Sequence, residues 1–282
     1  MSNSVSFRDY PKAKSFLFVS WIKKDDFKHC FASEADAIVI DLEDSVPAER
    51  KKESRANVLE FCRLNSDKKF FIRVNDAQSD FFNDDMVFIR ELGLKFIMGI
   101  MLSKAEQKEH IESVLKNLGE VPIILLIESA LGLQNLNLIA AHPCVKQLAF
   151  GAFDMILDLG LKDGYGKDFV LNYARVQMIL SSRIYNLLPP INRVFPNTKD
   201  ESKFKTHLEF VYSMGFSGAL TFYPNQLSII NEIFSQGDKE SEWAKEVLRL
   251  SKLHKGELFS FEGNRVDIST IKKAQGILKT QY

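Results

Sequence analysis

The sequence predicts a (β/α)₈ barrel, and three observations support that fold class. Eight short apolar runs follow one another along the first 224 residues. Each run is nearly continuous instead of alternating with polar residues, which is typical of parallel strands buried on both faces. Longer amphipathic segments separate the runs, and about 250 residues of alternating strands and helices match this barrel. A doubly wound open sheet is the structural alternative, although no GxGxxG follows the first run.

The apolar runs define the predicted strands, which in order are 15–20, 37–43, 69–75, 95–103, 121–129, 146–154, 189–196 and 217–224. The segments between them are expected to be helical. Segments 47–65 and 105–119 gather apolar residues on one face, and Gly119 suits a helix end. The gap 159–188 begins with a glycine-rich loop and ends in an amphipathic helix.

The strand pattern stops after about residue 235. A helical segment, a hairpin-like turn over 257–267 and a last helix follow, which together are too short for a standard domain. We therefore expect a barrel domain over residues 1–235 and a C-terminal helical extension over 236–282. The extension is expected to cover the barrel or to pack on a neighbouring subunit.

Composition excludes several classes of function. The 37 basic and 37 acidic residues balance, which argues against binding of nucleic acid or a membrane surface through bulk charge. The three cysteines are widely spaced without a zinc or redox motif, so a reducing, cytoplasmic setting is expected. Neither a signal peptide nor a membrane-spanning run is expected.

In this fold the active site lies at the C-terminal ends of the strands, so the polar residues that end each run are the candidates. Glu128 and Asp154 end consecutive predicted strands, which lie about 5 Å apart. Two such carboxylates repel each other unless they are protonated or bridged by a cation. Mg²⁺ is the natural bridge, because it takes one or two carboxylates and keeps water or substrate elsewhere. The alternative is that each acid caps a helix or pairs with a basic side chain.

The neighbouring runs add a basic group and more acids. Arg73 ends the third run and can hold a substrate carboxylate through two hydrogen bonds. It can equally pair with Asp41, Glu43 or Asp44, which end the second run, and both interpretations can hold together. The five histidines lie in helical or loop segments without metal-ligand spacing, so surface or capping roles are expected.

Several motifs in order carry a resemblance to a known family: "SFLFV", "ADAIVIDLEDSVPAERKKESR", "IRVN", "LLIESALG", "LAFGAFDMILDLG" and "GFSGALTFYPNQLSIINEIF". Over nearly its whole length the chain resembles the citrate lyase β-subunit-like group of the HpcH/HpaI aldolase superfamily. The resemblance implies a Mg²⁺-dependent barrel enzyme that cleaves or forms carbon–carbon bonds in acyl-CoA-type substrates. It places the substrate carboxylate on Arg73 and the metal on Glu128 and Asp154.

The resemblance also assigns the remaining candidate residues. Glu43 and Asp44 are expected to orient Arg73 or metal-bound water, and Asn75 and Ser129 to contact the substrate. The segment "EGNRVDISTIKKAQGIL" resembles the one that brings an aspartate to a neighbour's active site in malyl-CoA and citramalyl-CoA lyases. That aspartate corresponds to Asp267, which implies a homotrimer or a hexamer.

The chain departs from the family's pattern where charged or small residues are usual, at Ser20, Leu131, Phe153, Asn192, Ala219 and Tyr223. These changes make the surroundings of the metal and carboxylate sites less charged. They leave open whether the acyl group is carried by CoA, by a carrier protein or as a free acid. A second hypothesis is a non-catalytic barrel that binds a dicarboxylate or an acyl-CoA.

Overall fold

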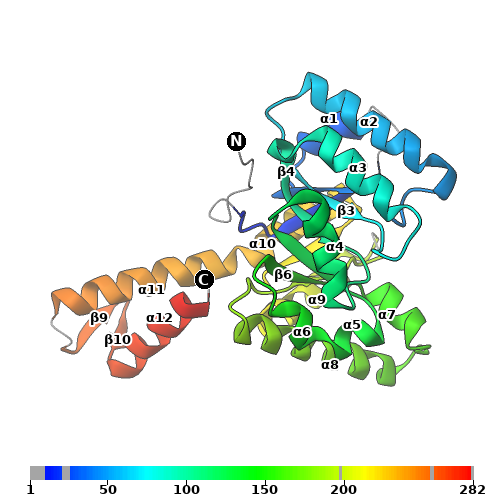
Figure 1. Ribbon diagram of the computed structural model, residues 1–282. Helices are drawn as coiled ribbons and strands as arrows, with labels where there is room; N and C mark the ends of the chain where they lie inside the picture. Colours follow the sequence, from blue (N-terminus) through cyan, green and yellow to red (C-terminus); the bar gives the residue numbers. More distant parts are fainter. Residues whose placement is uncertain (1–9, 21–25, 197–198, 255–256, 281–282) are drawn as a thin grey trace.

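The structure is a computed structural model that describes residues 10–20, 26–196, 199–254 and 257–280. Eight parallel strands form a closed barrel in chain order, with β8 paired back to β1 (Figure 1). The predicted (β/α)₈ barrel is therefore confirmed, and the open-sheet alternative is wrong. The barrel strands are β1 (Ser15–Ser20), β2 (Ala37–Asp41), β3 (Phe70–Val74), β4 (Ile97–Leu102), β5 (Ile123–Ile127), β6 (Val145–Phe150), β7 (Ile191–Asn192) and β8 (Gly218–Thr221).

Helices surround the barrel and connect its strands (Figure 1). They are α1 (Asp26–Phe31), α2 (Lys51–Leu64), α3 (Phe82–Leu92), α4 (Lys108–Leu118), α5 (Ala130–Gln134), α6 (Leu136–Ala140), α7 (Ala152–Asp158), α8 (Tyr165–Ile184), α9 (Glu201–Met214) and α10 (Leu227–Phe234), with 3₁₀ turns η2 (Ala48–Arg50), η3 (Leu94–Phe96) and η4 (Pro224–Gln226). In the part of the chain that the structure describes, no helix combines the length and apolar character needed to cross a membrane.

Burial on both faces explains why the strands read as continuous apolar runs. Along β1, Phe16 and Phe18 belong to a cluster that fills the barrel, whereas Leu17 and Val19 pack in the layer between strands and helices. Phe71 of β3 faces Phe16 inside the barrel, with ring centroids 5.8 Å apart. Because successive side chains of a strand point to opposite faces, a strand with two apolar layers needs apolar residues at every position.

Most predicted strands extend beyond the observed ones, and two of these differences have a local physical cause. The run 146–154 is predicted as strand as far as Asp154, but β6 ends at Phe150. The backbone leaves the strand at Gly151, and Asp154 lies in the first turn of α7, where a negative charge is favourable. The run 189–196 yields only the two residues of β7, which follow Pro189 and Pro190. Proline lacks the N–H group that a paired strand residue donates.

The C-terminal extension has a small core of its own. Helices α11 (Gln236–Leu253) and α12 (Ile268–Thr280) pack together beside the hairpin of β9 (Phe259–Phe261) and β10 (Asn264–Val266). The buried apolar residues of this unit are Ala244, Val247, Phe259, Val266 and Ala274. Figure 1 shows that the unit projects away from the barrel from the end of α10. Beside that junction, Lys14 Nζ lies 2.5 Å from the carboxylate of Asp238.

Candidate active site

The centre of the candidate site is a buried ion pair between neighbouring strands. The register of β2 and β3 places Arg73 beside Asp41. Arg73 Nε and Nη2 donate to the two carboxylate oxygens of Asp41 over 2.7 and 2.5 Å. Burial alone raises the pKa of Asp41, but the charge and hydrogen bonds of Arg73 outweigh burial, so the pKa is lowered. The structural pairing that the sequence allowed for Arg73 is therefore present, and its main partner is Asp41.

Other groups fix the position of the guanidinium. Its central carbon lies 4.6 Å from the ring centroid of Phe18, a favourable cation–π contact. Its Nη1 lies 3.0 Å from Glu43 Oε2. Because Asp41 also accepts a hydrogen bond from the backbone N–H of Glu43, the acids at the end of β2 form one assembly around Arg73.

Glu43 is a buried acid that lies between the cations of Arg73 and Lys104. Its side chain is buried, and its Oε1 lies 3.6 Å from Lys104 Nζ. Burial raises the pKa of Glu43 to about 7. The charge of Arg73 opposes this increase, whereas the charges of Asp44 and Asp41 add to it. Asp44 is exposed at the rim. Glu43 can therefore bind or release a proton near neutral pH.

Glu128 follows β5 directly and is also buried, with 3% of its surface exposed. Its Oε1 accepts a 2.7 Å hydrogen bond from the backbone N–H of Lys104. Lys104 adopts the left-handed conformation, with φ of 45°, at the end of β4. Burial and the charge of Glu43 raise the pKa of Glu128 well above its usual range.

Gly151 leaves the space that the side chain of Glu128 occupies. A Cβ atom added at residue 151 would lie 2.3 Å from Glu128 Oε2 and 2.4 Å from Glu128 Cβ. Any larger residue there would force Glu128 to move. The glycine that follows β6 therefore leaves the room in which Glu128 lies at the end of β5.

Asp154 faces the same space from the first turn of α7. Its side chain is half-buried, and its pKa is raised by burial and by the charge of Asp44, against Lys104 and Arg73. The charge of Asp154 in turn contributes to the raised pKa of Glu128. The structure thus gathers the predicted residues Arg73, Glu43, Asp44, Glu128 and Asp154 around one end of the barrel, although Asp154 arrives there on a helix.

The two predicted substrate contacts have hydrogen-bonding partners within the protein. Asn75 Nδ2 donates to the backbone oxygen of Leu42 and to Asp85, over 2.8 and 2.7 Å. Ser129 begins α5, where its hydroxyl accepts from the N–H of Gly132 and donates to Glu106. Asn75 also lines a cavity of about 340 Å³ at this mouth, together with Glu43, Asp44 and Lys104. Contact of Asn75 and Ser129 with a substrate stays a prediction.

Three further residues belong to this end of the barrel, although the sequence assigned none of them a role in the site. Lys51 Nζ donates to the backbone oxygens of Leu42 and Glu43, over 2.8 and 2.9 Å. Lys104 supplies both its amide and its ammonium group to the acids. His110 is buried in the first turn of α4, beside the backbone oxygen of Lys104, so of the two expected roles the surface one is wrong for it. The position of Lys104 at the end of a predicted strand was the available signal.

Asp267 lies in the extension, between β10 and α12, and away from the barrel mouth of its own chain (Figure 1). Its carboxylate accepts a 2.9 Å hydrogen bond from the N–H of Thr270 and one from the hydroxyl of Ser269. These hydrogen bonds, that of Ser269 first, lower its pKa to about 2. Asp267 is thus an ionised, partly exposed carboxylate at a helix start.

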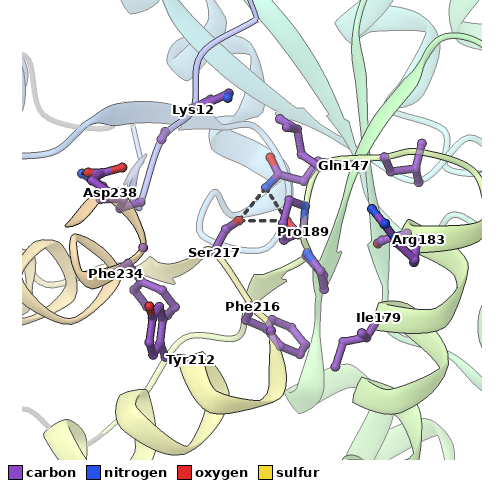
Figure 2. Close-up of a pocket in the computed structure, with 18 of the residues that line it drawn as sticks. Lys12, Gln147, Ile179, Arg183, Pro189, Tyr212, Phe216, Ser217, Phe234 and Asp238 are labelled. Atoms are coloured by element: carbon purple, nitrogen blue, oxygen red, sulfur yellow. Dashed lines mark hydrogen bonds and ion pairs between the residues drawn. The ribbon is translucent and has the colours of Figure 1, made fainter. Parts of the chain in front are cut away.

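A larger cavity, of about 650 Å³, lies at the opposite end of the barrel (Figure 2). Figure 2 shows its polar floor, where Gln147 Nε2 donates to the backbone oxygen of Pro189 and lies 3.3 Å from Ser217 Oγ. Aromatic side chains of Tyr212, Phe216 and Phe234 line another side. None of the predicted site residues lines this cavity, so its size does not make it the candidate active site.

The fold and the barrel mouth together define a (β/α)₈-barrel protein with a buried arginine and a cluster of acids at the C-terminal ends of its strands. The chain belongs to the HpcH/HpaI aldolase/citrate lyase family, whose model matches residues 14–224. The resemblance seen in the sequence motifs is thereby confirmed.

Individual relatives align over most of the chain. A citrate lyase subunit beta-like protein of Deinococcus radiodurans is 31% identical, over 94% of this chain and 96% of the relative. The mitochondrial citramalyl-CoA lyase of Mus musculus is 25% identical, over 98% of this chain and 88% of the relative. The structure is similar to that of the protein CitE from Mycobacterium tuberculosis in complex with magnesium, acetoacetate and coenzyme A, with a TM-score of 0.73, 22% identity and coverage of 96% and 98% of the two chains.

Proposed function

We propose that the protein is a Mg²⁺-dependent carbon–carbon lyase that acts on an acyl-CoA or acid derived from a 2-hydroxy or 2-oxo acid. The observation that carries the proposal is the burial of Glu128 beside Glu43 and Asp154. A buried carboxylate is costly unless its charge is compensated, and a divalent cation would compensate several acids at once. The barrel mouth is also where this fold places its chemistry.

The donors suit Mg²⁺ better than a softer metal. Glu128 and Asp154 would hold the ion through hard carboxylate oxygens, with water and substrate in its other positions. Among the described residues no three His, Cys, Asp or Glu side chains gather as a ligand set, which fits an ion held by few protein groups. When bound, the ion acts as a Lewis acid on the substrate's oxygen atoms and on the negative charge that develops in the reaction.

The chain's own residues supply binding and proton transfer. Arg73 would bind the substrate carboxylate, because Asp41 and Phe18 already hold the guanidinium in place. Glu43 and Asp44 would orient Arg73 and bound water, and Asn75 and Ser129 would line the substrate pocket. Asp267, supplied by a neighbouring copy in a trimer or hexamer, would exchange a proton with the carbon released by bond cleavage.

The proposed substrate class rests on the relatives of this chain and on the positions where it departs from the family's pattern. The mouse relative is a citramalyl-CoA lyase, and the similar mycobacterial structure holds coenzyme A and acetoacetate. We propose a related acyl-CoA, cleaved to a 2-oxo acid and an acyl product, or formed in the reverse direction. A cytoplasmic location is part of the proposal, since none of the three cysteines lies in a disulfide bond.

The decisive experiment combines metal binding with turnover. Purified protein with Mg²⁺ is supplied with malyl-, citramalyl- and citryl-CoA and with the free acids, and release of a 2-oxo acid is followed. Glu128→Gln is expected to keep the circular dichroism spectrum, to lose Mg²⁺ binding in calorimetry, and to slow turnover about 10²–10³-fold. The matched control Glu109→Gln changes an exposed glutamate of α4 and leaves both measurements unchanged. Full activity in Glu128→Gln would overturn the proposal.

A non-catalytic binding barrel is the second candidate. Leu131 and Phe153 are 42% and 44% exposed, at positions where the family usually carries a basic and an acidic residue. Exposed apolar groups near a charged mouth favour binding of an acyl chain over charge stabilisation during a reaction. This candidate predicts binding of an acyl-CoA in calorimetry together with no 2-oxo acid release from any compound of the panel.

A further inference from the structure

Helix α8 carries a second apolar face that the single chain leaves open. Its inner face buries Leu171, Ala174 and Met178 in the barrel's main core. Six large apolar side chains occupy its outer face, with exposed fractions of 96% for Tyr165, 77% for Phe169, 55% for Tyr173, 43% for Val176, 51% for Leu180 and 62% for Ile184. At 3.6 residues per turn these positions form one stripe about 100° wide. We call it the α8 stripe.

The α8 stripe is large for the surface of a monomeric protein. Aromatic side chains bury about 150–250 Å² each, so the exposed parts of its three aromatic residues alone amount to about 400 Å². Leu138 extends the apolar area from α6, which lies beside α8 through the 3.0 Å hydrogen bond between Ser181 and Asn137. The area exceeds the scattered apolar groups of ordinary surfaces and approaches the roughly 800 Å² per partner of a stable interface.

The residues of the α8 stripe are spaced symmetrically about the middle of the helix. Its residues form three pairs that are equally far from the helix midpoint, which are Tyr165 with Ile184, Phe169 with Leu180, and Tyr173 with Val176. Two copies of α8 in antiparallel orientation about a twofold axis would bring the members of each pair opposite one another. The central four positions also follow the 4-3-4 spacing by which paired helices interlock.

Helix dipoles favour the same orientation. Antiparallel pairing sets the positive end of one helix dipole beside the negative end of the other, whereas parallel pairing aligns like ends. The pattern is therefore self-complementary, as a twofold interface requires.

We propose that the α8 stripe is a self-association surface, through which two copies of this chain pair in antiparallel orientation about a twofold axis. This inference does not depend on the proposed enzymatic activity, because it uses only the outer surface of α8. The stripe explains why a helix on the outside of a barrel carries aromatic and aliphatic residues on its most exposed positions.

Light scattering after gel filtration tests the proposal. Phe169→Glu and Leu180→Lys, made singly, each bury a charge in the interface and are expected to reduce the particle mass twofold. Leu64→Glu is the matched control, since Leu64 is 81% exposed at the end of α2 and lies outside the stripe. It leaves the mass unchanged. Circular dichroism establishes that all variants are folded.

The double variant Phe169→Glu/Leu180→Lys tests the orientation. In the antiparallel pair the two new, opposite charges face each other across the axis, so the double variant recovers the mass that the single variants lose, and 1 M salt weakens it again. Two results would overturn the proposal. One is a mass that the single variants do not change. The other is a double variant that stays dissociated, which would mean that a different segment of a neighbour covers α8.

Discussion

At the scale of single residues, both burial and charge determine what the ion pair of Arg73 and Asp41 contributes to stability. Neither group is solvated, and Arg73 is the cation that compensates Asp41, while Arg73 also contacts Glu43. Removing one partner of a buried pair leaves an uncompensated charge and costs about 3–5 kcal/mol. Asp41→Asn is therefore expected to lower the free energy of unfolding by about that amount, measured by urea denaturation.

An exposed pair of similar geometry serves as the control for Asp41→Asn. Arg50 donates two hydrogen bonds to Glu53, and both residues are solvent-exposed. Glu53→Gln should leave the urea midpoint unchanged within error, because water solvates both groups. Equal effects of the two substitutions would show that Asp41 is not the anchor of Arg73.

Gly151 provides a second test at this scale. Gly151→Ala places a methyl group against Glu128, and overpacking of this kind costs about 1–3 kcal/mol. Because Glu128 must move, we also expect a loss of metal binding in calorimetry. Gly166→Ala in α8 is the control, since no atom lies within 4 Å of an added Cβ there. It is expected to raise stability slightly, because alanine loses less backbone entropy than glycine.

Single residues were predictable where a strand delivers them directly. Arg73 and Glu128 lie where their apolar runs end, and the register then determines what they face. Lys104 follows a predicted strand, but no sequence pattern marks its left-handed backbone or the burial of His110. Their roles arise because the barrel closes and brings separate loops together, which is a tertiary effect.

At the scale of elements, α9 contains a histidine that is held neutral. His207 Nε2 lies 3.0 Å from Asn192 Nδ2 of β7, and its ring packs on Phe195. A surface or capping role is expected from the sequence, and the structure places this ring at a partly buried position. Burial, with the nearby charges of Arg193 and Arg175, lowers its pKa to about 3.

The lowered pKa of His207 predicts acid sensitivity. The unfolded chain binds a proton at this residue below about pH 6.5, whereas the folded chain does so only near pH 3. This contribution to stability is complete above pH 6.5 and is lost as the pH falls, at about 1.4 kcal/mol per unit. His207→Gln should therefore flatten the dependence of the unfolding free energy on pH between 6.5 and 4. An unchanged slope in the variant would contradict the assignment to His207.

The sequence predicted the type and the order of the strands and helices, but not the residues at which they end. The eight apolar runs all became barrel strands, because apolar continuity reports burial on two faces. Their ends were overestimated, because the same apolar residues also start helices: Ala152 and Met155 are buried on α7 and not on β6. That difference moved Asp154 from a strand to a helix.

At the scale of the whole molecule, Asp267 lies in the extension, away from the barrel mouth of its own chain. If each active site combines one copy's barrel with another copy's extension, two inactive variants can complement each other. We expect Asp267→Asn and Glu128→Gln each to turn over at least about 10²-fold more slowly than the unaltered protein when expressed alone. After coexpression, roughly a quarter of the sites should recover, because each site needs two particular copies.

The control for complementation is a mixture of the two purified variants without exchange of subunits, which should remain inactive. A mixture of Glu128→Gln with Asp154→Asn should also fail, because both changes lie on the barrel side of the site. Recovery of activity in the mixture of Glu128→Gln with Asp154→Asn would contradict a site shared between copies. So would the absence of recovery when Asp267→Asn and Glu128→Gln are coexpressed.

The overall architecture was predictable where patterns of neighbouring residues along the chain determine it. Alternating runs predict the barrel, and the loss of that pattern marks the tail. The direction in which the extension projects was not predictable, because few contacts at the junction of α10 and α11 determine it.

The cavity of Figure 2 has a mechanical consequence for this junction. Gly237, Asp238 and Glu240 line it from the first turns of α11, opposite Phe216 and Ser217 of the barrel. A hollow beneath a helix offers few dispersion contacts to lose when the helix tilts. The partly exposed ion pair of Lys14 and Asp238 adds at most about 1 kcal/mol of resistance. The extension is therefore expected to tilt about this junction at little cost to the barrel's core.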